Sequence, residues 1–469
     1  MKLPPLFTAS TSTLLGEENY EMLAEALTQE PSVSIRMNGV EPPQEAMPVP
    51  WCANGYYLDR RLTFTFDPLF HAGCYYVQEA SSMFVEQAMK QYVSAEPVRM
   101  LDLCAAPGGK STLVRGLLPE GSLLVANEVM RNRVQVLAEN VTKAGHPDVV
   151  VTNNDPVDFA SLTDFFDVLL TDVPCSGEGM FRKDPGAIDE WSPANVDLCA
   201  QRQRRILTDC WPCLKPGGIL IYSTCTYNTC EDEENVAWMV RTFGAEVLPL
   251  EVSHEWGVTG NLLAGADFPV YRFLPHRTRG EGFFLAVVRK PGGEDFRDNL
   301  PGIPVRKKKK NRAAPPSAAD KDRCVVVRGW LSDPDAYTLT VAADGLAAFA
   351  LRHEEALALL SDSLRVVQAG VALAEVKGKD LLPRHALAMS RLLRPGTFPV
   401  VAVDYEAAIA YLRKEALSLP EDVPRGYVLL AYRGVKLGFV KNVGNRANNL
   451  YPPEWRIRSS YLPEEVRTL

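Results

Sequence analysis

The sequence predicts an α/β fold built on a mostly parallel sheet, with smaller units before and after it. The 469 residues are too many for one hydrophobic core, which stops growing at about 250–300 residues. Between residues 96 and 290, short apolar runs alternate with helical stretches, as in parallel strands joined by crossover helices. The apolar runs are Val98–Leu103, Leu123–Ala126, Val149–Val151, Val168–Leu170, Ile219–Tyr222 and Phe283–Val288.

The segments around this unit differ from it in composition. Residues 1–95 are too few and too polar at their start to hold the central sheet, so we expect a small cap. Residues 291–323 contain little apolar surface and carry a basic run, Arg306–Arg312, so they predict a linker. This run is either a solvated tether or a contact for nucleic-acid phosphates.

Residues 324–469 read as a second globular region with an α+β pattern. The predicted strands are Val325–Val327, Tyr337–Val341 and Tyr427–Tyr432. The predicted helices are Glu354–Leu360 and Tyr405–Glu415.

Composition excludes several classes of protein. The chain is 46% hydrophobic with no apolar run of about 18 residues, so we expect no membrane span. Its start lacks the apolar stretch of a secretory signal, and its ten cysteines do not resemble a disulfide framework, so we expect a cytoplasmic protein. The net charge of −8 argues against indiscriminate coating of nucleic acid, but a local basic face would suffice for RNA.

A loop of small residues follows the first predicted strand of the central unit. It runs from Cys104 through Ala105, Ala106, Pro107, Gly108 and Gly109 to Lys110, where a helix is expected to start. Small residues let a ligand approach the backbone, and a helix start offers free N–H groups. Glu128 ends the next strand, where an acidic residue typically binds ribose hydroxyls.

The ligand of this loop is expected to be a nucleoside without a phosphate. A phosphate-binding loop needs glycine five positions before Gly109, and Cys104 stands there instead. S-adenosylmethionine is the common cofactor of this kind. The alternative is a glycine turn with a purely structural role.

Two further acids are expected at the same edge of the sheet. Asp155 follows Val149–Val151, and Asp172 follows Val168–Leu170. Ligands of doubly wound sheets bind beyond the carboxyl ends of the strands, so Asp155 is a candidate for the adenine side. The next strand is expected to begin at Ile219, after a helix that ends in the turn Leu214–Gly218.

Two cysteines follow adjacent predicted strands. Cys175 lies in Asp-Val-Pro-Cys-Ser-Gly, and Cys225 lies in Ser-Thr-Cys-Thr-Tyr. A single cysteine is usually a small buried apolar residue, but two at neighbouring strand ends beside a cofactor loop predict chemistry. A thiolate that adds to carbon 6 of cytosine activates carbon 5 toward a methyl group, and covalent catalysis splits one hard step into easier ones.

With these motifs the chain resembles the Sun-type RNA (cytosine-5) methyltransferases, most closely those of the bacterial RsmF type. The resemblance rests on LDLCAAPGGKST, DVPCSGEGMFRKDP, YSTCTYNTCEDEENV and GEGFFLAVVRK. It extends upstream to Ser34–Asn38 and Tyr76–Ser82, and downstream to Gly426–Phe439 and Leu450–Arg456.

The resemblance implies a class I, Rossmann-like methyltransferase domain over residues 96–290 with a mostly parallel seven-stranded sheet, and a PUA-like RNA-binding module at the C-terminal end. It implies that Cys225 is the nucleophile, that Cys175 assists product release, and that Asp172 holds the cytosine. Residues Cys104–Lys110, Glu128, Asp155 and Asp172 would line S-adenosylmethionine. The implied partner is RNA, namely 16S ribosomal RNA or the small subunit, bound by a monomer through its flanking regions.

Other motifs predict no separate function. Cys210 and Cys213 close a helix and are read as packing, since a redox pair should open one and zinc usually needs four ligands. The six histidines lack metal-binding spacing, so we expect no metal. Glu231–Glu234 are read as the polar start of a helix. Arg182 and Lys183 are either surface charges or phosphate contacts.

Four alternatives stay open at this point. The chain could methylate DNA, protein or transfer RNA, or it could be a non-catalytic RNA-binding assembly factor that keeps the cofactor fold. We expect a chain that ends near Lys290 to keep its cofactor affinity and lose most RNA affinity. The reason is the positive charge of Lys307–Lys310 and of the C-terminal Arg433, Lys436, Lys441 and Arg446.

Overall fold

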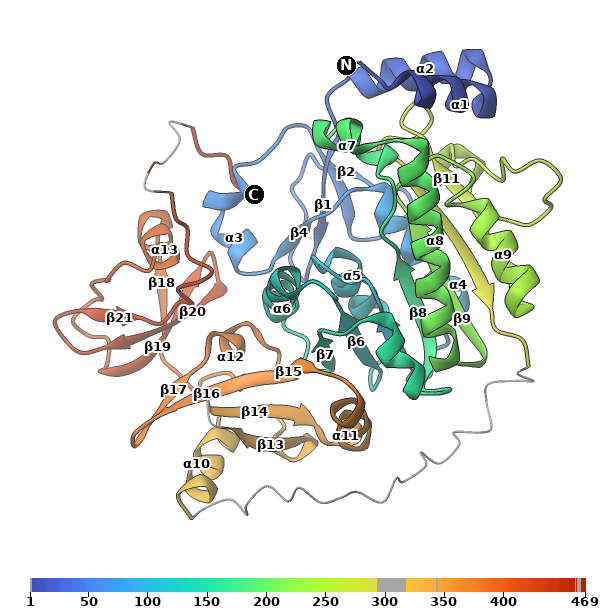
Figure 1. The fold of residues 1–469 in the computed structure, drawn as a ribbon. Coiled ribbons are helices and arrows are strands. Elements are labelled where there is room, and N and C mark those ends of the chain that lie inside the picture. The colour runs from blue at the N-terminus through green and yellow to red at the C-terminus, as the bar shows by residue number, and fades with distance from the viewer. Residues whose placement is uncertain (1, 293–317, 343–344, 460, 462–464) are drawn as a thin grey trace.

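The computed structural model of the chain describes residues 2–292, 318–342, 345–459, 461 and 465–469. A large central sheet carries helices on both faces, and Figure 1 shows the C-terminal elements below it and beside it. The N-terminal helices α1 (Pro5–Leu15) and α2 (Glu17–Thr28) lie at the opposite end. No helix within the described ranges is long and apolar enough to cross a membrane.

Each of the six predicted apolar runs forms a strand of the central sheet. They are β5 (Arg99–Asp102), β6 (Leu123–Asn127), β7 (Val149–Thr152), β8 (Phe166–Asp172), β9 (Leu214–Thr224) and β12 (Phe283–Arg289). Strands β5 to β9 are parallel to one another. Strand β12 pairs antiparallel with β9, and β10 (Glu246–Leu248) pairs antiparallel with β12. The order β10-β12-β9-β8-β5-β6-β7 accounts for the seven predicted strands.

Two more strands bring the sheet to nine in the described chain. β11 (Tyr271–Phe273) pairs with β12, and β15 (Val366–Ala369) pairs antiparallel with β7. The start predicted for β9 at Ile219 is wrong, because the strand includes the turn residues from Leu214. They are held in the sheet by the end of β12: Gly217 N–H donates to the Lys290 carbonyl at 2.8 Å, and Lys290 N–H donates to the Gly218 carbonyl at 2.9 Å.

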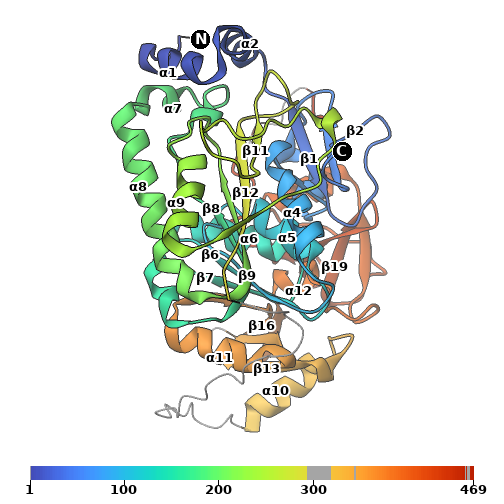
Figure 2. The same cartoon turned by 90° about the vertical axis from the view of Figure 1, so that its right-hand side faces the viewer.

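Helices cover both faces of the central sheet (Figure 2). One face packs on α4 (Val85–Tyr92), α5 (Gly109–Leu117) and α6 (Arg131–Ala144). The other packs on α8 (Pro193–Cys210), α9 (Glu233–Phe243) and α11 (Glu354–Ser363). Burial on both faces explains why the strands read as nearly continuous apolar runs.

The first segment forms an antiparallel sheet in the order β2-β3-β1-β4. Its strands are β1 (Val33–Met37), β2 (Met47–Pro48), β3 (Gly55–Leu58) and β4 (Tyr75–Val77). The short helix α3 (Pro68–His71) lies between β3 and β4, and α7 (Pro185–Glu190) lies in the central unit near α1. Ile35 and Tyr75 share a core with Tyr411 and Tyr451, so this sheet packs against the end of the chain.

The C-terminal region contains two four-stranded sheets. One is β13 (Tyr337–Ala342), β14 (Gly345–Ala350), β16 (Val371–Lys377) and β17 (Asp380–Pro383), followed by α12 (His385–Met389). The other is β18 (Val400–Val403), β19 (Gly426–Tyr432), β20 (Val435–Asn442) and β21 (Ala447–Asn449), with α13 (Tyr405–Leu412). The predicted strands at 337–341 and 427–432 and the predicted helices at 354–360 and 405–415 are present, the last ending at Leu412.

The strand predicted at Val325–Val327 is wrong. Helix α10 (Ala318–Arg328) occupies these residues, so the predicted linker cannot extend to residue 323. Val325 and Val326 are exposed while Val327 is buried, which is a one-sided helical pattern that three consecutive valines conceal in the sequence. The basic run Arg306–Arg312 lies outside the described residues.

Candidate active site

The two predicted cysteines meet at the carboxyl edge of the central sheet. Because β8 and β9 are parallel neighbours, the loops that follow them leave the sheet side by side. The Sγ atoms of Cys175 and Cys225 are 3.2 Å apart, within hydrogen-bond distance for two thiols, and both cysteines are free. Their loops approach closely at Gly179, where a Cβ would lie 2.8 Å from the Cys225 carbonyl oxygen, so only glycine fits.

A charged pair lies beside the cysteines. Lys110 Nζ, in the first turn of α5, donates to Asp172 Oδ2 at 2.8 Å, and Ser223 Oγ donates to Asp172 Oδ1 at 2.8 Å. These contacts join the ends of β8 and β9 to the cofactor loop. Ser223 was not among the predicted residues, although it stands two positions before Cys225 in the same motif.

The environment keeps these groups in defined protonation states. The hydrogen bond with Cys225, together with burial, raises the pKa of Cys175 well above its usual value. Burial alone would lower the pKa of Lys110, but the adjacent Asp172 carboxylate outweighs it and the pKa is raised. The site therefore contains a neutral thiol at Cys175 and a permanent ammonium ion at Lys110.

A buried polar network lies behind the Cys175 loop. Glu231 accepts hydrogen bonds from Ser176 N at 2.9 Å and from Gln203 Nε2 at 2.8 Å. Glu178 accepts from Tyr227 N at 2.8 Å, in the loop that follows Cys225. Two acidic side chains thus fix the conformation of both cysteine loops by binding their backbone N–H groups.

The reading of Glu231–Glu234 as a polar helix start is therefore incomplete. Glu233 and Glu234 do lie in the first turn of α9, but Glu231, Asp232 and Glu233 are fully buried. Asp232 and Glu233 pair with the buried Arg272, whose Nη1 lies 3.2 Å from Asp232 Oδ2 and whose Nε donates to Glu233 at 2.6 Å. Their partner lies on β11, 39 residues from Glu233, so no local pattern in the sequence pointed to it.

Arg182 has neither of its two predicted roles. Its side chain is 7% exposed and forms an ion pair with Glu281 at 3.0 Å, while Lys183 lies 3.6 Å from the same carboxylate. Arg182 is thus a structural cation inside the protein, neither a solvated charge nor free for a phosphate.

The predicted cofactor loop joins β5 to α5. Gly108 has a φ of +113°, which favours glycine, and it caps α5 at Gly109. Ala105 N–H donates to the Asn127 carbonyl, and Asn140 and Arg133 of α6 donate to the carbonyls of Pro107 and Ala106. The loop from Cys104 to Lys110 is therefore held in place by backbone and side-chain hydrogen bonds, and it ends at the N-terminus of α5, whose first N–H groups have no partner within the helix.

Glu128 and Asp155 follow the two outer strands, as predicted. Glu128 is buried; its Oε1 accepts from Met130 N at 2.8 Å, and Arg133 lies 3.4 Å from Oε2. Asp155 is more exposed and pairs with Arg205 of α8 at 3.0 Å. A buried carboxylate at the end of β6 and a glycine turn at the end of β5 are the groups at this edge that could hold a nucleoside cofactor.

Asp102 is a buried acid that the sequence analysis did not single out. It ends β5, accepts from Ser111 Oγ at 2.6 Å, and burial raises the pKa of its carboxyl to about 7. Its position at a strand end inside the LDLC motif was the available signal.

Cys210 and Cys213 end α8 and the short helical turn after it. Both are fully buried among apolar side chains and both are free, in agreement with a packing role.

The fold and the strand-end residues define a methyltransferase of the Rossmann-like class. A methyltransferase homologue from Pyrococcus horikoshii is 28% identical, with a TM-score of 0.52 over 61% of this chain and 94% of that one. NSun6 from the same organism, solved with SFG, is 21% identical, with a TM-score of 0.51 over 62% of this chain and 99% of that one.

Sequence comparisons narrow the class to a family. The family model "16S rRNA methyltransferase RsmB/F" matches residues 93–289, that of the RsmF N-terminal domain matches 3–80, and that of the RsmF PUA domain matches 398–457. "Ribosomal RNA small subunit methyltransferase F" of Escherichia fergusonii is 30% identical over 434 residues, covering 87% of this chain and 84% of the relative. The protein of that name from Klebsiella pneumoniae is 33% identical over 432 residues, covering 87% and 84%.

The chain therefore belongs to the ribosomal RNA small subunit methyltransferase F family, a family of S-adenosylmethionine-dependent RNA methyltransferases. The C-terminal sheet β18-β19-β20-β21 corresponds to its PUA domain.

Proposed function

We propose that the chain transfers a methyl group from S-adenosylmethionine to carbon 5 of a cytosine in 16S ribosomal RNA, through a covalent bond between Cys225 Sγ and carbon 6. The observation that carries this proposal is the contact of two free thiols, 3.2 Å apart, beside the Lys110–Asp172 pair. The names of the relatives, which are small-subunit ribosomal RNA methyltransferases, support the substrate.

The raised pKa of Cys175 argues against that residue as the nucleophile, because only a thiolate attacks carbon 6. In the proposed reaction Cys225 gives up its proton, and the Cys175 S–H, 3.2 Å away, then donates to its sulfur. The Lys110 ammonium adds a nearby positive charge. Both groups stabilise the attacking sulfur before the base arrives.

Asp172 is proposed to hold the cytosine ring nitrogen or amine. Its two oxygens accept hydrogen bonds from Lys110 and Ser223, which fix the carboxyl at the end of β8. Attack of Cys225 forms the Sγ–C6 bond, breaks the C5–C6 π bond and makes carbon 5 nucleophilic. Carbon 5 would then take the methyl group, with S-adenosylhomocysteine as the leaving group. A base removes the carbon 5 proton, and the released electron pair restores the C5–C6 double bond as the Sγ–C6 bond breaks; Cys175 assists this release.

The cofactor is proposed to lie along Cys104–Lys110, with Glu128 on the ribose, Asp155 toward the adenine and Asp172 near the methionine end. S-adenosylmethionine supplies the electrophilic methyl group. The target base must leave its stack to reach the thiols, as other base-modifying enzymes require. Residues 96–290 carry this chemistry, and the flanking regions are proposed to bind RNA.

The test separates the two cysteines on a denaturing gel of protein incubated with 16S ribosomal RNA and cofactor. Cys225→Ala should abolish methylation and leave no covalent adduct, because it removes the nucleophile. Cys175→Ala should accumulate an adduct that survives denaturation, and the double variant should not. An adduct with Cys225→Ala but not with Cys175→Ala would reverse the roles. If Cys225→Ala supports normal modification of ribosomal RNA in cells, the chain acts as a non-catalytic factor instead.

A further inference from the structure

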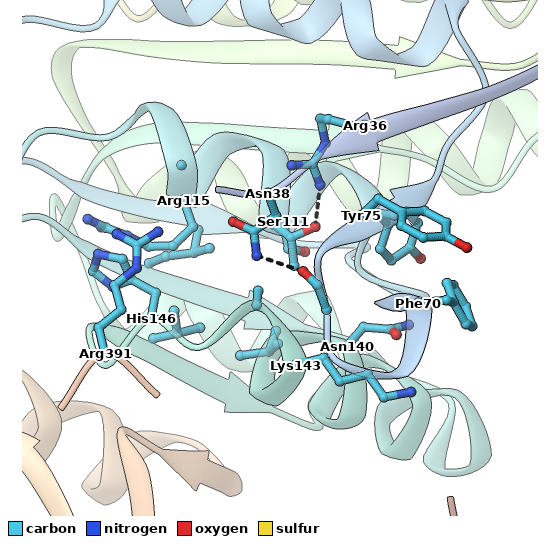
Figure 3. A pocket seen from close by; sticks show the side chains of 18 residues that line it. Arg36, Asn38, Phe70, Tyr75, Ser111, Arg115, Asn140, Lys143, His146 and Arg391 are labelled. Atoms are coloured by element: carbon cyan, nitrogen blue, oxygen red, sulfur yellow. Dashed lines mark hydrogen bonds between the residues drawn. The ribbon is translucent and has the colours of Figure 1, made fainter. Parts of the chain in front are cut away.

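A basic cavity lies beside α5 and α6, next to Leu124 of β6 and Val149 of β7. It occupies about 50 Å³ between α5, α6 and the strands β1 and β4, and Arg391, after α12, closes one end (Figure 3). Three parts of the chain that are distant in sequence thus line one space. Within the described residues, its lining includes no Asp or Glu. Five of the lining side chains are basic, namely Arg36, Arg115, Lys143, His146 and Arg391.

Arg36 and Lys143 have side-chain partners within the protein. Arg36 Nε donates to Gln78 at 2.9 Å and its Nη2 donates to Thr112 at 2.6 Å, so it joins β1 to α5. Lys143 Nζ pairs with Glu139 at 2.5 Å. The other three, Arg115, His146 and Arg391, gather at one end of the cavity (Figure 3).

Some donors at this end lack acceptors. Arg115 is 4% exposed, and its Nη1 and Nη2 donate to the carbonyls of Ser122 at 2.9 Å and Pro119 at 3.5 Å. Its buried Nε has no hydrogen-bond partner in the described chain. His146 Nδ1 accepts from Asp148 N at 3.2 Å, which leaves the neutral ring's proton on Nε2, without a partner among the described residues. The Arg391 guanidinium likewise has neither a hydrogen bond nor an ion pair in the part of the chain that the structure describes. Among these donors only Arg115 Nε is fully buried, and an unpaired buried donor is costly. His146 Nε2 and the exposed Arg391 add unpaired donors at the same end, so this end is suited to an acceptor.

Positive charge exceeds negative charge here. Burial, together with Arg115, Arg391 and Arg352, lowers the pKa of His146 to about 3, and burial lowers the pKa of Arg115 to about 10. The nearby carboxylate is Asp148, which is already paired with Arg352 at 2.7 Å. Three guanidinium groups therefore face one carboxylate.

We propose that Arg115, His146 and Arg391 bind a phosphate group of the RNA backbone at this end of the cavity. The inference rests on the proposed function for its partner. A cavity holds a water in about 10–15 Å³, so about 50 Å³ admits a group of a few heavy atoms, such as phosphate, but not a whole nucleotide. Guanidinium groups are the usual ligands of phosphate. A chain of net charge −8 also needs a local positive site for RNA.

This site would position RNA without reading its sequence, as backbone contacts do. The cavity is lined by Ser111 and Thr112, directly after Lys110 in α5. One helix thus extends from the proposed reaction centre to the phosphate site. A phosphate held there places the RNA relative to the cysteines at a fixed distance along α5.

The first test compares two exposed arginines three residues apart. Arg391→Gln removes one ligand from the cavity, whereas Arg394→Gln removes a matched charge outside it. In a fluorescence titration of the full chain with 16S ribosomal RNA, Arg391→Gln should weaken binding about 5- to 10-fold. The slope of log K against log salt should also fall by about one. Arg394→Gln should change affinity less than twofold, and equal losses in the two variants would overturn the proposal.

The second test reads the site directly through the proton resonance of His146, assigned by its loss in His146→Gln. A phosphate beside the ring offsets the surrounding cations, so equimolar RNA should raise the pKa of His146. Inorganic phosphate should do so only at millimolar concentration. A response to inorganic phosphate but not to bound RNA would show a site for a free anion and overturn the RNA assignment. If the wild-type chain binds no RNA at all, the proposed function fails, and the phosphate titration alone still reports whether the cavity binds an anion.

Discussion

The two functional stretches of the central sheet are stabilised in different ways. At the tips of β8 and β9, the cysteine loops are fixed by acids buried inside the same unit, such as Glu178 and Glu231. At the ends of β6 and β7, the residues beside Glu128 are held by residues of the C-terminal region. Strand β15, more than 200 residues away in sequence, pairs with β7, and Arg365 bonds to Asn153 and Asn154.

This difference indicates that the C-terminal region has two separate roles. The cysteine loops are held by contacts with residues before 290. In contrast, strand β7, next to the proposed cofactor edge with Glu128 and Asp155, pairs with β15 of the C-terminal region. Asn153 also donates to the carbonyls of Glu128 and Val129, so the bracing reaches the predicted ribose ligand. The C-terminal region therefore supports the cofactor edge as well as carrying a PUA domain.

The largest effect is expected from the buried ion pairs behind the cysteine loops. Arg272→Met leaves Asp232 and Glu233 buried without their cation, and breaking a buried pair typically costs about 3–5 kcal/mol. The matched control at the cofactor edge is Arg205→Met, which breaks the exposed pair with Asp155 and should cost about 0–1 kcal/mol. Urea denaturation of both variants measures the difference, and similar losses would show that the two regions are not stabilised differently.

The sequence predicted the strand-end residues well because their positions follow from local periodicity. Asp172, Cys175 and Cys225 each follow an apolar run, and parallel strands bring their ends to one edge. The contact of Cys175 with Cys225 required only that β8 and β9 be neighbours. The same reasoning placed Glu128 and the Gly108 turn beside each other.

What the sequence did not predict depends on partners far along the chain. Arg182 was read as a surface or phosphate-binding charge because Glu281, its partner, is 99 residues away. Strand β15 lies in a region without a clear period, and its pairing with β7 has no local signature. Residues 325–327 form part of helix α10, although three adjacent valines favour a strand by propensity. Val327 packs there in the core of the C-terminal region.

An intermediate effect is expected at Asp102, at the end of β5 between the two regions. Its folded-state pKa of about 7 lies above the unfolded value of 3.8, so between about pH 4 and 7 the folded state holds a proton that the unfolded state releases. Stability should therefore fall as the pH rises through this window, by up to about 1.4 kcal/mol per pH unit.

Asp102→Asn removes this titration while keeping an acceptor for Ser111. Denaturation between pH 5 and 7 should show the wild-type chain losing about 2 kcal/mol more than the variant. Parallel pH profiles for the two proteins would mean that Asp102 is ionised in the folded state throughout the range.

The smallest effect is expected from the hydrogen bonds between Asn154 and Arg365, next to the pairing of β7 with β15. Asn154 Oδ1 accepts from Arg365 N at 2.9 Å, and its Nδ2 donates to the Arg365 carbonyl at 3.2 Å. Asn154→Ala removes both bonds to Arg365, the residue before β15, each contributing about 0.5–1.5 kcal/mol, and loosens the segment next to Asp155. Affinity for S-adenosylmethionine should fall about 5- to 10-fold by calorimetry, although Asn154 is not itself a proposed ligand.

Gln368→Ala is the matched control, because Gln368 lies farther along β15 and its side chain bonds, within the described residues, to Thr142 of α6 alone, at 3.2 Å. Its cofactor affinity should stay within about twofold of wild type. The pairing of β15 with β7 also changes the expectation for a chain that ends near Lys290. Such a chain lacks β15 and exposes the core face that α11 covers, so cofactor affinity should be lost along with RNA affinity. Wild-type cofactor affinity in both Asn154→Ala and the shortened chain would show that the cofactor edge is built by the central unit alone, and the contrast between the two regions would then disappear.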